Sequence, residues 1–465
     1  MIRIELGAVY NINDYDELAR MFLPRGEYEF VFEKAPVFEG VPAKLEKARG
    51  MYALLSGHTG RTLPWGVLTG VKPTKLFAQL AGGDPGSGAG RAEAMLQKEY
   101  LASEEKARLL RRIYERERAV LPAPHYGEAG SAARDAEAGL PAGGAVAVYI
   151  GIPFCPSRCA YCTFTSGVGT EKQMAAYLAA LYEELSYVAG GMRRRGMRAE
   201  SVYIGGGTPT ALTASMLEEL LGRVNEAFIA AGAEFTVEAG RPDTIAYEKA
   251  LLIARAGATR VSVNPQAMND ATLERIGRRH KAADTRAAFE NVRAAGIPIV
   301  NADIIAGLPG EGTEDFRRTL EGTLALSPEN VTVHTLALKK GSALGESSPG
   351  YQYTARSAAG EMLRIAGEWL GGAGMAPYYL YRQKLMVENL ENTGYTLPGM
   401  ECVYNMRMMQ EKQTVIALGA GAASKLYYPA EDRVERVFNM ADTGLYIERI
   451  REMVERKRKL FGVAP

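Results

Sequence analysis

Three cysteines set close together constrain this chain more than any other feature. Cys155, Cys159 and Cys162 follow the spacing C-x3-C-x2-C, and the 465 residues contain only one other cysteine, Cys402. Proline and glycine residues around the three predict a loop, which can turn neighbouring thiols toward a common centre, whereas a strand would send alternate side chains to opposite faces. Three thiolates on one loop predict an iron–sulfur cluster, because cysteine sulfur holds such clusters.

Two other interpretations of the cysteines are less favourable. A structural zinc site needs four ligands, but no histidine lies near and Cys402 is more than two hundred residues away. Three unrelated buried thiols are also conceivable, but such clustering in a cysteine-poor chain argues against them. A four-iron cluster with three protein ligands keeps one iron open for a reactive ligand.

The composition is that of an ordinary globular protein. A hydrophobic content of 47% is enough for a sizeable core, and the net charge of +1 indicates no general attraction to nucleic acid or acidic membranes. Few cysteines, most of them on one loop, exclude a disulfide scaffold and favour a reducing compartment. The sequence shows neither a signal region nor an apolar run of membrane-spanning length, so we expect a cytoplasmic protein with no stable membrane insertion.

Changes in composition divide the chain into three domains and a linker. Residues 1–120 combine strand-like runs with a long helical pattern at 91–121, and predict an N-terminal α+β domain without an assigned role. Residues 121–144 are rich in Ala, Gly and Pro and predict a linker. Residues 145–340 form the central domain, and 341–465 a smaller α+β domain on the substrate side, with a basic helix at 446–460.

The central domain alternates short β-rich runs with helical stretches. Six strand–helix units predict a parallel sheet with helical crossovers. A closed eight-unit barrel would need two more units, so an open partial barrel is expected. The six predicted strands are 145–152, 201–204, 234–238, 260–264, 300–305 and 331–336.

Glycine-rich and polar residues follow these strands, at the edge where open parallel sheets bind ligands. The run Gly-Gly-Gly-Thr-Pro at 205–209 matches neither common nucleotide-binding pattern, but its glycines let the backbone approach a ligand closely. Any one of the polar residues is usually a structural partner, whereas five at the same end of successive strands favour a binding site. They are Glu238, Asn264, Gln266, Arg278 and Asp303.

The cysteine spacing, with Tyr161 before the last cysteine, resembles the signature of radical SAM enzymes. The run Tyr-Ile-Gly-Ile-Pro-Phe-Cys at 149–155 resembles the oxygen-independent coproporphyrinogen III oxidase family, and the segments at 63–66 and 379–384 resemble its HemZ branch. The resemblance implies a radical SAM partial (β/α)6 barrel with a [4Fe–4S] cluster and S-adenosylmethionine. It implies Cys155, Cys159 and Cys162 as cluster ligands, and as S-adenosylmethionine contacts Tyr149, Gly206, Gly207, Thr208, Glu238, Gln266, Arg278, Asp303 and Ala337.

The same resemblance implies an oxidoreductase of haem biosynthesis, which converts coproporphyrinogen III to protoporphyrinogen IX by oxidative decarboxylation without oxygen. It implies a tetrapyrrole substrate and a low-potential electron donor such as flavodoxin or ferredoxin. Two positions depart from the best-known enzymes, since Gly151 replaces a histidine and Phe164 replaces a further cysteine. The alternatives are a haem-binding chaperone of the same family, another radical SAM reaction on a tetrapyrrole such as haem ring opening, and a zinc-stabilised binding module.

A substrate with four carboxylates requires cationic side chains, preferably arginine. Arg382 and Lys384, within a tyrosine-rich stretch, are candidates, and a basic surface stretch explains them equally well. Arg61, Lys72 and Lys75 could meet an anionic ligand, although a basic surface turn is the better interpretation.

Two histidines complete the candidates. His280 and His334 could serve as proton donors or haem ligands, but histidines satisfied within the core are more common. Cys402 is too isolated to receive a role.

Overall fold

The computed structural model describes residues 1–9, 11–35, 40–82, 87–121, 143–164, 166–339, 341–347 and 358–461. Residues 122–142, which make up most of the predicted linker, lie outside this range. Within the described ranges, none of the helices combines the length and the apolar character that crossing a bilayer requires.

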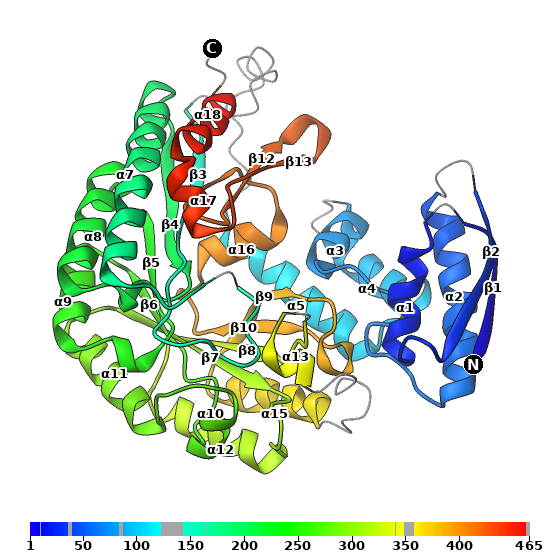
Figure 1. The fold of residues 1–465 in the computed structure, drawn as a ribbon. Coiled ribbons are helices and arrows are strands. Elements are labelled where there is room, and N and C mark those ends of the chain that lie inside the picture. The colour runs from blue at the N-terminus through cyan, green and yellow to red at the C-terminus, as the bar shows by residue number, and fades with distance from the viewer. Residues whose placement is uncertain are drawn as a thin grey trace.

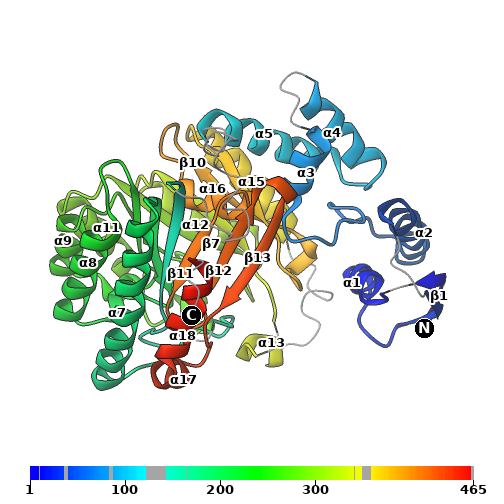
Figure 2. The same cartoon turned by 90° about the horizontal axis from the view of Figure 1, so that it is seen from above.

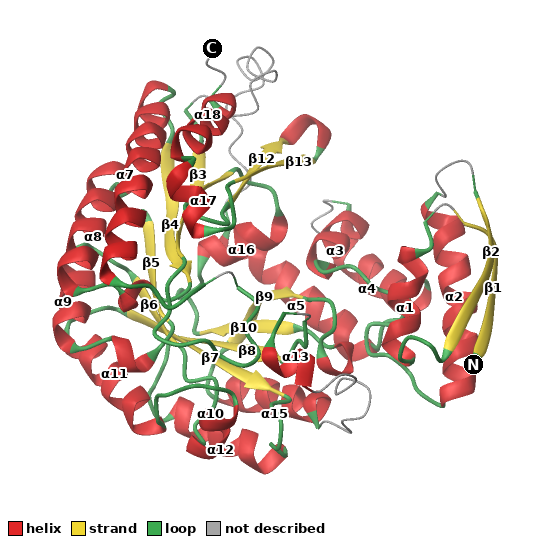
Figure 3. Cartoon of the chain, in the orientation of Figure 1, coloured by secondary structure: helices red, strands yellow, loops and turns green. Residues whose placement is uncertain are grey.

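One curved sheet of eleven strands forms the centre of the molecule (Figures 1 and 3), in the order β13-β12-β11-β3-β4-β5-β6-β7-β8-β10-β9. The strands from β3 to β8 pair in parallel, each with the next. All six predicted strands are confirmed, and the open partial barrel with them. They are β3 (Ala145–Ile152), β4 (Arg198–Gly206), β5 (Glu234–Ala239), β6 (Arg260–Val263), β7 (Ile299–Ala306) and β8 (Asn330–Thr335).

Helices cover the outer, convex face of this sheet (Figure 1). Helix α8 (Ala214–Phe228) shows why: Leu217, Leu220, Leu221 and Val224 recur with helical spacing and are all buried. The parallel strands are apolar on the face beneath, as expected for a sheet covered by crossover helices. The other helices of this layer are α7 (Glu171–Arg194), α9 (Tyr247–Arg255), α10 (Asp270–Arg275), α11 (Ala282–Ala294), α12 (Thr313–Leu324) and α15 (Ala359–Gly372).

The last quarter of the chain extends the same sheet on both sides. Beyond β8 the antiparallel strands β10 (Asn392–Thr396) and β9 (Ala376–Tyr381) are added. At the other edge β11 (Val415–Leu418) pairs in parallel with β3, and two antiparallel strands follow it. Both edges of the six-strand core are thereby covered. The remaining elements of this part are α13 (Ala343–Ser347), α16 (Val403–Gln410), β12 (Ala423–Tyr428), β13 (Arg433–Phe438), α17 (Thr443–Glu448) and α18 (Ile450–Leu460).

The N-terminal residues form a small α/β unit beside the open side of the barrel (Figure 2). Its two strands pair in parallel, and its last helix packs on β9 around the buried Leu380. The helical pattern expected at 91–121 is interrupted, because Leu101 adopts φ +58° and Ser103 caps a new helix. The elements are β1 (Ile2–Val9), α1 (Asn13–Phe22), β2 (Tyr28–Lys34), α2 (Val41–Thr59), α3 (Pro73–Ala81), α4 (Gly88–Lys98) and α5 (Glu104–Val120).

Buried polar contacts fasten this N-terminal unit to the barrel. Glu391, at the end of the segment before β10, accepts hydrogen bonds from Trp65 Nε1 at 2.8 Å and from Lys106 Nζ at 2.7 Å. Arg382 Nη1 donates to the carbonyl of Leu68 at 2.6 Å. A buried ion pair of this kind becomes costly when one partner is removed, so the unit has a defined position against the strand ends of the barrel.

Candidate functional site

The three cysteines lie on the irregular loop between β3 and α7, as the glycine and proline residues predicted. Their thiols are free and half-buried. At one end of the loop Cys155 N donates to Gly167 O over 3.0 Å, and in the middle Ala160 N donates to Ile276 O over 2.9 Å. The first contact closes the loop on itself, and the second fastens its middle to the end of α10.

Two side chains donate toward the cysteine sulfurs. Thr208 Oγ1 lies 3.5 Å from Cys155 Sγ. Arg241 Nη1 lies 3.7 Å from Cys159 Sγ, and the same guanidinium donates to the carbonyl and the hydroxyl of Ser157. A guanidinium beside a sulfur can complement the negative charge that this sulfur carries as an iron ligand. Arg241 was missed in the sequence, although its position directly after the third predicted strand was a usable signal.

The donor set fits an iron–sulfur cluster better than a single ion. Among the residues that the structure describes, no group of three or more His, Cys, Asp or Glu is arranged to hold one metal ion. A four-iron cluster makes a different demand, because each cysteine binds its own iron. Burial raises the pKa of the Cys162 thiol, so iron binding would displace its proton.

The glycine-rich turn after β4 lies directly against the start of the cysteine loop. Gly207 N donates to Ile152 O at 2.8 Å, and Thr208 N donates to Phe154 O at 2.7 Å. A Cβ atom on Gly207 would lie 2.6 Å from Phe154 O, so no other residue fits there. Gly206 has φ +106°, which side chains rarely adopt. The turn and the cysteine loop therefore form one continuous surface.

Glu238, at the end of β5, is held beneath this turn. Tyr203 OH donates to Glu238 Oε1 at 2.6 Å, and a Cβ atom on Gly205 would lie 2.8 Å from Glu238 Oε2. Burial raises the pKa of Glu238 to about 7. Tyr149 stacks on Tyr203 with ring centroids 6.3 Å apart. The predicted residues of β3, β4 and β5 thus lie together.

Gln266 lies between β6 and β7 at the same edge of the sheet, and its backbone conformation is strained. Its φ is +65°, an uncommon value for a residue other than glycine. Gln266 N donates to Asp303 O, and Gln266 O accepts from Ile305 N, each at 2.9 Å. The amide oxygen Oε1 is buried and has no hydrogen-bond partner among the described residues. Strain and an unsatisfied buried acceptor both carry a cost, and both are typical of ligand sites.

Asp303, in β7, is paired with a histidine of the neighbouring strand. His334 Nε2 lies 3.3 Å from Asp303 Oδ2, and Tyr381 OH lies 3.4 Å from His334 Nδ1. Burial alone would raise the pKa of Asp303, but the histidine and a hydrogen bond from Asn301 outweigh it and lower that pKa. Both ring nitrogens of His334 face protein groups, so in this arrangement neither is open to bind haem iron.

Arg278 connects the strand ends to the cysteine loop. Its Nη1 donates to Gly240 O at 2.8 Å and to Asn264 O at 2.9 Å, and its Nη2 donates to Tyr161 OH at 3.1 Å. The Nε atom is buried without a partner among the described residues. Ala337, just beyond β8, is half-buried and pairs with Met386 in an isolated antiparallel bridge.

The structure thus places all twelve predicted residues along one end of the parallel strands, and their contacts with a cofactor stay a prediction. His334 lies with them through its contact with Asp303, and His280 Nε2 lies 3.3 Å from Pro265 O, whereas the two lysines and Cys402 lie elsewhere. Lys72 and Lys75 pair with Glu411 near the opposite end of the sheet. His280 is buried with its pKa lowered to about 3, chiefly by that burial. Cys402 lies 3.4 Å from a carboxylate oxygen at the start of β5.

Comparisons with known proteins agree on the superfamily. The model of the Radical SAM superfamily matches residues 149–321. The "Oxygen-independent coproporphyrinogen-III oxidase-like protein HemZ" of Bacillus subtilis is 38% identical over 410 residues, which cover 87% of this chain and 78% of that protein. The heme chaperone HemW of Bacillus subtilis is 33% identical over 193 residues, 41% of this chain and 50% of that protein.

A solved structure shows the same fold. The coproporphyrinogen III oxidase HemN of Escherichia coli superposes with a TM-score of 0.56 at 21% sequence identity, covering 71% of this chain and 74% of that one. The oxygen-independent coproporphyrinogen III oxidase of Paracoccus denitrificans is 35% identical over 206 residues, 44% of this chain and 45% of that protein. The relatives therefore include proteins named as oxidases and proteins named as chaperones.

Proposed function

Because this chain belongs to the oxygen-independent coproporphyrinogen III oxidase-like family of radical SAM proteins, we propose that it decarboxylates coproporphyrinogen III to protoporphyrinogen IX. The cofactors of this family are a [4Fe–4S] cluster and S-adenosylmethionine. One observation carries the proposal: the cysteine loop, the glycine-rich turn and a row of incompletely paired polar groups meet at one end of the sheet. We include a cytoplasmic location in this proposal.

Cys155, Cys159 and Cys162 are the proposed cluster ligands. When bound, the cluster and S-adenosylmethionine supply the radical that removes a hydrogen atom from the substrate. The donors from Thr208 and Arg241 stabilise negative charge on two of the sulfurs.

The strand-end residues are proposed to hold S-adenosylmethionine in one orientation. Gln266 Oε1 is a ready acceptor for an ammonium or hydroxyl group, since nothing in the described protein uses it. Asp303 stays ionised because its pKa is lowered, which suits an acceptor of hydrogen bonds. Glycine at 206 and 207 lets backbone groups approach the cofactor. Fixing the reacting atoms in this way removes much of the entropic cost of the reaction.

Aromatic side chains support a tetrapyrrole substrate. Tyr203 stacks on Tyr404 at 4.6 Å and lies beside Tyr149, and Tyr379 stacks on Tyr381 at 6.4 Å. These rings come from both halves of the sheet and belong to an apolar cluster. Flat apolar rings favour a planar apolar body, and exclusion of water by such a substrate would protect a radical from side reactions.

The test is anaerobic incubation of the reconstituted protein with coproporphyrinogen III, S-adenosylmethionine and a strong reductant. Formation of the divinyl product supports the proposal. Replacing the chemical reductant by flavodoxin or ferredoxin, in separate incubations, tests the proposed electron donor. Absence of product with a fully loaded cluster and cleaved S-adenosylmethionine would reject the proposed substrate.

Two positions favour a haem-binding chaperone as the second candidate function. Phe164, which stands two residues beyond the last cysteine, is 70% exposed. The other is Gly151, which stands where the best-known enzymes have a histidine; a Cβ atom there would make ordinary van der Waals contacts, 3.4 Å from Leu418 O and 3.5 Å from Tyr149 Cε1. Tight haem binding without a decarboxylated product, measured on the same preparation, would select the chaperone.

A further inference from the structure

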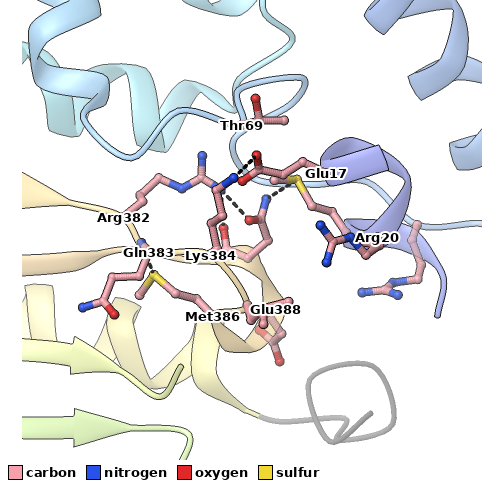
Figure 4. Close-up of a pocket in the computed structure, with 12 residues that line it drawn as sticks. Glu17, Arg20, Thr69, Arg382, Gln383, Lys384, Met386 and Glu388 are labelled. Carbon is pink, nitrogen blue, oxygen red and sulfur yellow. Dashed lines mark hydrogen bonds and ion pairs between the residues drawn. The ribbon is translucent and has the colours of Figure 1, made fainter. Parts of the chain in front are cut away.

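A cavity of about 110 Å³ lies between the N-terminal unit and the segment 382–389 that follows β9 (Figure 4). One wall is formed by α1 and residues 61 and 69, and the other by the segment after the strand. The charged groups in its walls are four cations and two carboxylates, so the lining carries excess positive charge. They are Glu17, Arg20, Arg61, Arg382, Lys384 and Glu388.

Three of the cations lack full compensation. Arg382 is 3% exposed and contacts no carboxylate within ion-pair distance among the described residues; its partners are the carbonyls of Leu68 and Asn389 and the Asn389 side chain. Its Nε atom is buried without an acceptor. Among the described residues, the Arg61 guanidinium has only the carbonyl of Phe22 as an acceptor. Arg20 lies with its Nε 3.1 Å from Asp16 Oδ2 as an ion pair, but among the described residues that Nε makes no hydrogen bond.

Of these three cations Arg382 is buried, whereas Arg20 and Arg61 are half-buried. A buried charge without a counter-charge is unfavourable unless an anion completes it. Burial lowers the pKa of Arg382 to about 10, so the group is still charged at neutral pH. Guanidinium groups pair best with planar carboxylates, through two parallel hydrogen bonds. The volume holds a few heavy atoms, given that a water molecule takes about 30 Å³, which suits a carboxylate arm and is too small for a tetrapyrrole ring.

The segment 385–387 lies between the cavity and the residues that follow β8. Met386 lines it and also pairs with Ala337, beyond β8. Leu338 N donates to Leu385 O at 3.0 Å, and Val387 N donates to Leu336 O at 2.9 Å. The same segment shows backbone strain, since Leu385 and Asn389 have φ values of +62° and +56°. The segment 385–387 therefore borders the cavity and pairs with the residues that follow β8.

We propose that this cavity binds a carboxylate arm of the substrate, so that the N-terminal unit takes part in substrate binding through Arg20 and Arg61. The inference rests on the proposed function, in which the substrate carries four carboxylates. For Arg61 it favours an anionic ligand over the basic surface turn that the sequence alone favoured. A carboxylate that is bound far from the reacting arm helps to hold that arm in the orientation the reaction needs.

The experiment measures binding of coproporphyrin III, a stable tetracarboxylate, and of its tetramethyl ester to the full-length reconstituted protein. Arg20→Gln and Arg61→Gln should each weaken binding of the acid about tenfold, the effect of losing a charge-assisted hydrogen bond. Neither should change binding of the ester. The matched control is Arg25→Gln, because Arg25 also pairs with Asp16, at 2.9 Å, but is 65% exposed at its side chain and does not line the cavity.

Equal affinity of the unmodified protein for acid and ester would overturn the inference. So would an effect of Arg25→Gln as large as that of Arg20→Gln, because a general charge effect would then explain both. Inorganic phosphate that displaces no porphyrin, yet binds with the same dependence on Arg20, would assign the cavity to a free anion and reject the substrate arm.

The experiment distinguishes failure of the cavity assignment from failure of the proposed function. Cluster content and cleavage of S-adenosylmethionine are measured on each variant and should match the unmodified protein. If the unmodified protein forms no divinyl product while acid binding still depends on Arg20, the proposed function falls and the carboxylate cavity stands. If product forms and both variants bind the acid normally, the cavity assignment falls and the proposed function stands.

Discussion

Two polar clusters at opposite ends of the parallel sheet differ in how completely they are paired. At the strand starts, all five N–H donors of Arg260 have acceptors. These are the side chains of Asn330, Thr236 and Glu234 and the backbone carbonyls of Met400 and Glu401. We call Glu234, Arg260 and Asn330 the Arg260 cluster. At the strand ends, the row formed by Glu238, Gln266, Arg278 and Asp303 contains buried atoms without partners.

The difference separates a structural role from a binding role. A buried charge with every hydrogen bond made fixes the arrangement of the strands and has nothing left for a ligand. Unsatisfied buried atoms cost stability, so a chain keeps them where a ligand provides the missing partners. The strand-end row should therefore govern cofactor binding, and the Arg260 cluster should govern folding.

Cys159→Ala gives the largest expected effect on function. It removes one of three cluster ligands, so iron content after anaerobic reconstitution and all activity should be lost, while the melting temperature of the iron-free protein stays nearly unchanged. Cys402→Ala is the matched control, since Cys402 lies against Glu234 in the Arg260 cluster. Iron retained by Cys159→Ala, or lost from Cys402→Ala, would contradict the ligand assignment.

Arg260→Ala should give the largest loss of stability. Removal of one partner from a buried ion pair costs roughly 3–5 kcal/mol, because Glu234 is left buried and uncompensated. Denaturant unfolding of the iron-free protein measures it. Arg317→Ala, which breaks the exposed pair with Glu314, should cost about 0.5 kcal/mol or less. Comparable losses in the two variants would remove the structural role of the cluster.

Asp303→Asn tests the strand-end row with a change of charge and little change of shape. Affinity for S-adenosylmethionine should fall about tenfold or more, as expected when a charged hydrogen-bond partner becomes neutral. Iron content should be unchanged, because Asp303 makes no hydrogen bond or ion pair with the described residues of the cysteine loop. Equilibrium binding to the reconstituted protein gives the measurement, with Asp284→Asn at the exposed start of α11 as control. Equal affinities in the two variants would exclude Asp303 from the site.

Glu238→Gln tests the strand-end row through the pH dependence of the free energy of unfolding, and its expected effect is the smallest. Folding raises the pKa of Glu238 from 4.5 to about 7, chiefly through burial. Between these values the native state holds a proton that the unfolded chain has released. The contribution of this group to the free energy of unfolding is therefore complete below about pH 4.5 and is lost as the pH rises toward 7. The variant should lose this pH dependence; an identical profile in both proteins would show that Glu238 is ionised in the native state.

Much of the barrel could be predicted because apolar residues recur with clearly different spacings in its strands and in its helices. The pairing of the C-terminal strands could not. Strand β11 has four residues, and its place beside β3 follows from the need to cover an open edge, which no local pattern records. The break between α4 and α5 depends on one left-handed residue, Leu101, whose conformation follows from tertiary packing.

The site shows the same division between pattern and packing. The cysteines and the glycine-rich turn are contiguous motifs, so their chemistry is readable in the sequence. Arg241 was missed because its proximity to Cys159 depends on how the loop folds back. Arg382 was considered as a substrate contact, and the structure shows it buried and largely engaged with backbone carbonyls. Only the structure shows that its Nε atom lacks an acceptor among the described residues and that Arg382 lines a cavity.

The pairing of β11 with β3 has a consequence for synthesis on the ribosome. The first strand of the barrel is made early, but the strand that covers its outer edge is among the last to emerge. During most of translation residues 147–150 present an open, apolar edge to the cell, where it can recruit other extended chains. Truncation before residue 415 should therefore yield an aggregating product, and nascent chains of this protein are expected clients of general chaperones.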